Sequence, residues 1–237
     1  MLRRVCAILD LECFQHKQLL FYREVGFIPI SDFCTHCFET SPRAGEDIFS
    51  TAIYPPFVPS QRDSALWRTF RTLTYRVHGL GFVPDSNYPS IPHDHLQPLL
   101  QGWYDGVKTS NRYLVAYKGG LTEKNLLYSL GIPSLNLEKY HIPPFHSLSA
   151  NDYRWYDELC CNQHHYLENT VRVNHCPRME VAYLRDIMVQ KEREEIEDLN
   201  TDTEQQEREE AASNEHKVEQ LEYDDVEYDE ASPSSVL

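Results

Sequence analysis

The chain has no run of about eighteen apolar residues, which is the length a helix needs to cross a bilayer. Its opening stretch MLRRVCAILDLECFQ carries acidic residues where the apolar region of a signal peptide would continue, so secretion is not indicated. We therefore expect an intracellular protein, cytoplasmic or nuclear, with no membrane partner. In that setting the seven cysteines favour metal binding or free thiols over disulfides.

The largest aromatic residues are missing from one region, because residues 191–237 contain no Phe and no Trp. This region has eighteen acidic and four basic residues, a net charge of −14 out of the chain's −15, which leaves −1 for residues 1–190. Such a composition cannot bury enough apolar surface to offset the chain entropy lost on folding. We predict a folded domain over residues 1–190, then the end of a helix and a disordered acidic tail over 200–237.

Apolar periodicity and turn residues predict the elements of the domain. In chain order these are strands over 4–13, 18–30, 47–55 and 112–120, and helices in the first half of 64–79, over 94–107, over 121–131 and from 178 onward. A short polar turn joins the first two strands into a hairpin. Hairpin strands followed by helices that alternate with strands predict an α/β or α+β domain of three layers.

Two carboxylates interrupt the first apolar strand, which reads AILDLECF over residues 7–14. Asp10 and Glu12 are two positions apart, so in a strand they lie on the same face. Burying such a pair is costly unless a cation lies between the two groups. The alternative is that the strand has already ended and that both acids meet water.

Three segments together resemble the DEDDh 3′–5′ exonucleases, a family with the RNase H-like fold, over about residues 4–190. The Asp-x-Glu of that family's first strand is matched by Asp10 and Glu12. The segment AYKGGLTEKNL aligns with its strand, turn and helix, and places Thr122 at the second acid, with Glu123 beside it as a substitute. The segment HCPRME aligns with the His-x4-Asp of its last helix.

The resemblance implies an α/β domain of the RNase H-like type, with a mixed central sheet between helices. It also implies that Asp10, Glu12 and Glu180 hold Mg²⁺ or Mn²⁺, and that His175 takes a proton from the attacking water. Lys118, beside the double glycine, is expected to touch a substrate phosphate. The implied substrate is the end of a single-stranded RNA or DNA.

A second group of metal ligands precedes the last helix in ELCCNQHHYLENTVRVNHCPRME. Its Cys161, His164 and Cys176 have a spacing compatible with structural zinc. This pattern resembles the Maelstrom domain, a branch of the same fold that holds zinc through Glu, Cys, His and Cys, and REVGF places Glu24 at the first position. Two alternatives stay open: the cysteines are buried apolar residues, or the CTHC pair at 34 and 37 supplies ligands instead.

The sequence thus leaves two functions open. The first is a divalent-metal 3′–5′ exonuclease, and the second is a catalytically inactive, zinc-stabilised module of the Maelstrom type that binds RNA or a protein. A run of four arginines among aromatic residues offers a phosphate track with stacking rings in either case, or else a solvated helix face. These arginines are Arg62, Arg68, Arg71 and Arg76. The acidic tail could dock a basic protein partner.

Overall fold

The computed structural model describes residues 2–30, 48–58, 64–84, 86–149, 156–161, 164 and 176–224. The chain divides into two compact units, residues 1–190 and 191–237. The first unit is a mixed α/β domain.

A six-stranded mixed sheet forms the centre of the domain, in the order β4-β3-β2-β1-β5-β6. Strand β1 pairs with β2 and β2 with β3 in antiparallel fashion, whereas β3–β4, β1–β5 and β5–β6 are parallel. The strands are β1 (Val5–His16), β2 (Leu19–Pro29), β3 (Phe49–Tyr54), β4 (Ser90–Pro92), β5 (Leu114–Tyr117) and β6 (Ser134–Asn136).

The helices follow from amphipathic or glycine-bounded segments. They are α1 (Ser64–Leu73), α2 (Leu96–Val107), α3 (Leu121–Ser129) and α5 (Pro177–Asp224), and a π-helical turn over Thr74–His78 continues α1. Helix α3 is closed by Gly131, whose φ of +67° is a left-handed conformation that few other residues adopt readily, and the Ile132 amide donates back to the Leu127 carbonyl. This stop brings the chain back into β6.

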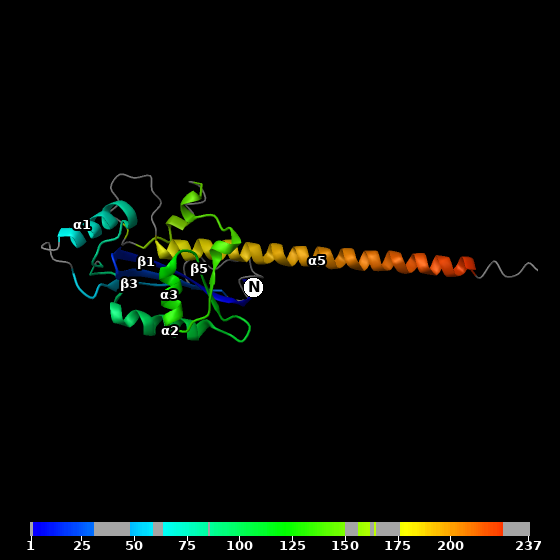
Figure 1. Ribbon diagram of the computed structural model, residues 1–237, viewed down its shortest axis with the longest axis horizontal. Helices are drawn as coiled ribbons and strands as arrows, with labels where there is room; N and C mark the ends of the chain where they lie inside the picture. Colours follow the sequence, from blue (N-terminus) through cyan, green and yellow to red (C-terminus); the bar gives the residue numbers. More distant parts are fainter. Residues whose placement is uncertain are drawn as a thin grey trace, which may run out of the picture. The chain divides into compact units, whose positions relative to one another are not determined.

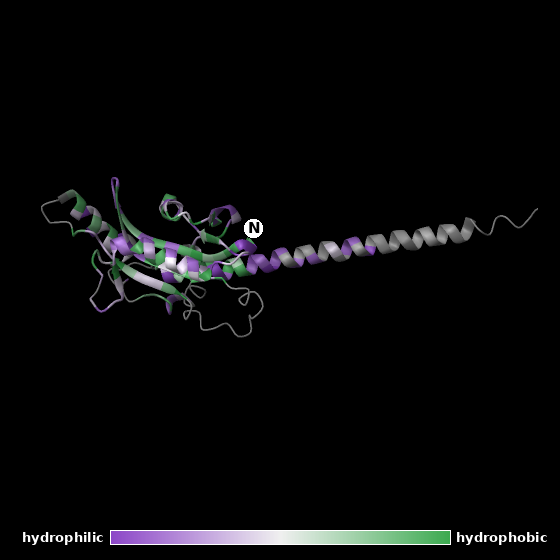
Figure 2. Cartoon of the chain, turned by 90° about the horizontal axis from the view of Figure 1, so that it is seen from below, coloured by the Kyte–Doolittle hydropathy of each residue, from purple (hydrophilic) through white to green (hydrophobic). Residues whose placement is uncertain are grey.

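Alternating side chains of the central strands pack against helices on the two faces of the sheet. Ile8, Ile28 and Ala116 join an apolar cluster with Met179 and other residues at the start of α5. Their neighbours along the same strands, Leu9, Phe27 and Val115, instead join a cluster with α2 and α3. Figure 1 shows α2 below the strands and the start of α5, in yellow, above them. The domain therefore has three layers, and its strands are largely hydrophobic along their length (Figure 2).

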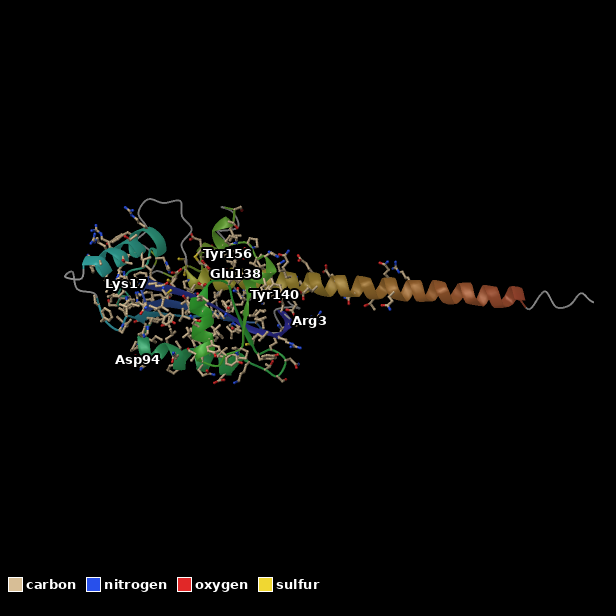
Figure 3. All side chains as sticks on the ribbon, viewed as in Figure 1. Arg3, Lys17, Asp94, Glu138, Tyr140 and Tyr156 are labelled. Atoms are coloured by element: carbon tan, nitrogen blue, oxygen red, sulfur yellow. The ribbon has the colours of Figure 1, made fainter. Side chains whose placement is uncertain are left out.

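A separate aromatic cluster lies at the far end of the hairpin. Phe14 and Phe21, both almost fully buried, pack there against Leu66 and Phe70 of α1. The side chains of His16 and Thr69 approach to 2.9 Å and tie β1 to α1. Figure 3 shows that Lys17, in the hairpin turn, and Arg3 lie at opposite ends of the domain.

The structure confirms the predicted hairpin, third strand and helices, each within a few residues of its expected bounds. It adds the three-residue strands β4 and β6, which the sequence reading missed. The prediction of disorder from residue 200 was wrong for residues 200–224, because α5 continues to Asp224. Glu, Gln, Lys, Arg and Ala favour a helix even where nothing apolar is buried. Among the described residues, no helix has the length and apolar character needed to span a bilayer.

Candidate metal centres beside strand β1

Asp10 and Glu12 lie inside β1 and are 7% exposed each, so the strand does not end before them. In the antiparallel register Asp10 pairs with Gly26, and Glu12 pairs with Glu24. Paired residues of antiparallel strands point to the same face of the sheet. The two carboxylates therefore lie on one face of the sheet, as their spacing predicted, and this face meets the start of α5.

The start of α5 crosses the sheet directly above Gly26. A Cβ atom at position 26 would lie 2.6 Å from the carbonyl oxygen of Pro177, so only glycine permits this approach. Glu180 follows Pro177 by about one helical turn and contributes its charge to the environment of Asp10. A glycine in β2 thus allows the last helix to bring an acidic side chain over β1.

Glu123 is the acid that α3 contributes to this region, and its side chain is only 7% exposed. Burial raises the pKa of Glu123, a hydrogen bond to its own backbone lowers it, and repulsion from Glu12 and Glu180 raises it further, to about 7. Helix α3 carries Glu123 in its first turn and begins directly after the Gly119–Gly120 pair that follows β5. The electrostatic contributions of Glu12 and Glu180 place Glu123 in the same acidic group.

Four carboxylates therefore gather beside the middle of β1: Asp10, Glu12, Glu123 and Glu180. Burial raises the pKa of Asp10 well above its ordinary value, and the negative charges of Glu180, Glu123 and Glu12 raise it further, in that order. Buried carboxylates that lie side by side favour the protonated form of one of them unless a cation lies among them. Oxygen ligands of this kind suit Mg²⁺ and Mn²⁺, so the residues fit the predicted ions.

The remaining residues of the predicted catalytic set have different outcomes. Thr122 is half-buried, and its hydroxyl is hydrogen-bonded to the thiol of Cys13, so in α3 it is Glu123 that joins the acids. The ammonium group of Lys118 donates to the Pro143 carbonyl at 2.6 Å and is close enough to Glu180 to feel its charge. Its contact with a substrate phosphate stays a prediction. His175, the predicted general base, lies outside the described residues.

A pocket of about 560 Å³ opens at the carboxyl ends of β5 and β6, beside the first turn of α3. Its lining includes Gly119, Gly120, Lys124, Asn136 and Lys139. In α/β sheets, ligands commonly bind outside the carboxyl ends of the parallel strands. The pocket lies within a few residues of Glu123, and it combines open backbone at the glycines with two lysines.

The second predicted centre is fully assembled: Glu24, Cys161, His164 and Cys176 are all buried, and one ligand atom from each lies within 4.8 Å of the others. His164 Nε2 is 2.7 Å from one Glu24 oxygen, while the other oxygen, Oε1, is buried and has no hydrogen-bond partner among the described residues. The Cys161 amide donates to the Cys176 sulfur at 3.4 Å. This group could hold a metal ion, whereas the rival pair Cys34 and Cys37 lies outside the described residues.

The protonation of this second group also fits a cation site. Burial lowers the pKa of His164, but hydrogen bonds to Cys176 and Glu24 outweigh it and raise the pKa to about 11. Burial raises the pKa of Cys176, but hydrogen bonds from Cys160, Cys161 and His164 bring it well below its ordinary value. The group therefore favours a negative charge on Cys176 next to a positive charge, and a bound cation would satisfy the same requirement.

The two centres share their supporting backbone. Glu24 of the second centre pairs across the sheet with Glu12 of the first, and Cys176 immediately precedes the helix that carries Glu180. Cys176 also contributes to the raised pKa of Asp10. An ion in either centre therefore changes the electrostatic environment of the other.

No family model matches this chain, and a search of curated proteins returns no match. The assignment of a function therefore depends on the geometry of the two centres and on the fold that positions them.

Proposed function

We propose that residues 1–190 form an RNase H-like nuclease domain of the DEDDh type that removes nucleotides from the 3′ ends of single-stranded RNA or DNA. One observation carries the proposal: four acids from β1, α3 and α5 meet beside one strand, where burial and then their mutual repulsion raise the pKa of Asp10. Isolated surface acids do not behave in this way, because each finds water or a basic partner.

The architecture supports the proposal. An antiparallel hairpin with a third strand, followed by parallel strands beside β1, is the mixed sheet expected of the RNase H-like type. The acids occupy the elements that the resemblance predicts, namely the first strand, the helix after the double glycine and the last helix. This agreement extends over elements separated by more than a hundred residues, which the motif match alone did not require.

The chemistry assigned to these residues is as follows. Asp10, Glu12, Glu123 and Glu180 would hold Mg²⁺ or Mn²⁺, which supplies electrostatic stabilisation of the attacking and leaving oxygens during phosphodiester displacement. Because Glu123 is an acid, it compensates for the neutral Thr122. The raised pKa values of Asp10 and Glu123 keep protons on the cluster until a cation displaces them.

For the second centre we propose structural Zn²⁺. Two thiols and an imidazole bind Zn²⁺ in preference to Mg²⁺. Four protein ligands complete the coordination of Zn²⁺ and leave no open position for a reacting water. Its ligands come from β2, from the segment around Cys161 and from the residue before α5. Zinc would fix the start of α5 and, with it, the position of Glu180.

The test is a cleavage assay on a 5′-labelled single-stranded oligonucleotide with Mn²⁺ or Mg²⁺, with zinc quantified in the same samples. We expect stepwise shortening from the 3′ end that is lost in Asp10→Asn and in Glu123→Gln. Glu158→Gln, which changes an exposed acid in the same way, should cleave like the unmodified protein.

Cleavage that survives Asp10→Asn would come from another site or from a contaminant, and it would refute the assignment of the acidic cluster. Absence of cleavage from a protein that holds about one zinc per chain would favour the second function, a zinc-stabilised module that binds RNA or a protein. Two observations favour this second function: Thr122 is neutral, and all four residues of the proposed zinc site lie together.

A further inference from the structure

A groove of about 500 Å³ lies at the aromatic end of the domain, apart from both metal centres in the elements that line it. One wall is the exposed side of α1 and of the π-helical turn that follows, and the other is the segment 81–83. The lining residues are Trp67, Phe70, Arg71, Thr74, Tyr75, Gly81, Phe82 and Val83.

The helical wall presents rings and a cation in a single row. Trp67, Arg71 and Tyr75 are spaced by four residues, which places them on about the same side of the helix. Trp67 is 38% exposed and Tyr75 is 36% exposed, although rings of this size are usually more deeply buried in a domain core. Such a row offers the faces of two aromatic rings for stacking, and the guanidinium group between them can donate hydrogen bonds to an anion.

The charge of this region is opposite to that of the whole chain. Residues 64–84 contain three arginines and no acidic residue, in a protein with a net charge of −15. Arg68 and Arg76 lie on the same two helical turns as Arg71, whereas Arg62 lies outside the described residues. A ligand that follows α1 therefore meets positive charge along its length, and a polyanion is the complementary partner.

The opposite wall of the groove is held in place from beneath. Arg23 is fully buried in β2, and its guanidinium donates twice to the Gly81 carbonyl, at 2.7 and 3.2 Å, and also to the Ile53 carbonyl. It lies 5.9 Å from the centre of the Phe82 ring, which in turn stacks on Phe70 at 4.3 Å. The groove is therefore built into the fold by a buried cation and an aromatic stack, which reduces the ordering cost of binding.

We propose that this groove binds single-stranded nucleic acid, with bases stacked on Trp67 and Tyr75 and a phosphate held by Arg71. Stacking on aromatic rings within a basic groove is how proteins bind single strands without reading their sequence. The inference rests on the proposed function for the identity of the polymer, and it deepens that function by giving the strand a second contact remote from the acids. A remote contact of this kind improves binding of the substrate more than the chemical step.

The test measures binding and cleavage separately on the full chain. Anisotropy of a 5′-fluorescein-labelled twelve-nucleotide oligothymidylate or oligouridylate is followed in buffer without Mg²⁺ and Mn²⁺, so that the strand stays intact. Trp67→Ala should weaken binding by about tenfold or more, whereas Trp67→Phe, which retains a stacking ring, should stay within a few-fold of the unmodified protein.

Two further readouts separate a direct contact from a change in the fold. Oligonucleotide binding should quench part of the tryptophan fluorescence, and this part should vanish in Trp67→Phe while the affinity persists. Arg71→Gln should reduce the slope of log affinity against log salt by about 0.7, the value for one phosphate of a single strand. Arg3→Gln, which removes an exposed arginine at the opposite end of the domain (Figure 3), should leave the affinity and its salt slope almost unchanged.

The outcomes distinguish this inference from the proposed function. Binding that is lost in Trp67→Ala, in a chain that never cleaves, supports the groove and refutes the nuclease. Cleavage and affinity that are both unchanged in Trp67→Ala and Arg71→Gln support the nuclease and refute the groove. An unmodified chain that binds an acidic peptide but no oligonucleotide also refutes the groove as a nucleic-acid site.

Discussion

Replacing Glu123 by Gln should stabilise the protein in the absence of Mg²⁺ and Mn²⁺ while it removes nuclease activity. Gln is nearly isosteric with Glu but carries no charge, so the change removes repulsion from Glu12 and Glu180 and the cost of burying a carboxylate. An exposed glutamate with no acidic neighbour would show no such gain. The prediction therefore tests whether Glu123 belongs to a functional cluster.

The size of the effect follows from the pKa of about 7 in the fold against an ordinary value of 4.5. Because the folded value is the higher one, the native state binds more protons between these values, and stability falls as pH rises through that window. The relation gives a loss of about 1 kcal/mol at pH 5 and about 3 kcal/mol at pH 8, relative to the fully protonated protein. The Gln variant escapes this loss, so its advantage should grow from about 1 to about 3 kcal/mol over the same range.

The assay is urea unfolding of both proteins between pH 5 and pH 8, with Glu158→Gln as an exposed-acid control that should show no advantage at either pH. Titration of the second centre affects both proteins alike and cancels in their difference. Addition of Mn²⁺ at 100 times its Kd should then stabilise only the unmodified protein, by about 2.7 kcal/mol, and nearly remove the advantage of the variant. Equal stability of the two proteins at pH 8 without Mn²⁺ would refute the placement of Glu123 in the acidic cluster.

Three other changes test the remaining parts of the site. Cys176→Ser should remove about one bound zinc per chain and lower the thermal midpoint; full retention of zinc, measured by mass spectrometry, would contradict the ligand set. Gly26→Ala forces a Cβ against the Pro177 carbonyl and should cost about 1–3 kcal/mol, whereas an unchanged urea midpoint would show that α5 does not pack there. Thr122→Ala should keep nuclease activity within a few-fold, whereas a loss on the order of 100-fold, the upper end of the range for residues that support a metal site, would return the role to Thr122.

The sequence predicts those features of the fold that depend on local residues alone. The apolar runs of β1 and β2 are long enough to identify a buried hairpin, and Gly131 marks the end of α3 because its left-handed φ disfavours most other residues. By contrast, β4 and β6 contain three residues each, and such short segments acquire their identity only by pairing with β3 and β5. No local pattern encodes that pairing.

The tail shows a different limit of composition. A segment with few apolar residues cannot build a core of its own, and residues 191–237 have such a composition. Composition alone does not decide between coil and a single helix, however, because a helix satisfies its own backbone hydrogen bonds. Strong helix formers, and pairs such as Arg193 and Glu197 at a spacing of four, favour the helix through residue 224.

The four residues of the second centre could be identified from sequence because three of them fall within sixteen residues, and only Glu24 required the resemblance. Whether Thr122 or Glu123 joins the acidic group could not be predicted from the sequence in the same way. A single helical step of 100° decides which of the two neighbours faces β1, and that rotation depends on how α3 packs after the double glycine. The structure places Glu123 among the acids and leaves Thr122 with Cys13.

The two centres are best understood as one cooperative unit, since both depend on the path of the chain between Cys176 and Glu180. That path is possible because Gly26 lets Pro177 approach the sheet, and the ligand set around Cys176 fixes its first residue. Loss of zinc would leave the charge of Cys176 compensated only by the protonated His164, and it would free the start of α5 from β2. Glu180 would then lose its fixed position over Asp10, so a zinc-depleted protein should lose nuclease activity even though every acid of the first centre is still present.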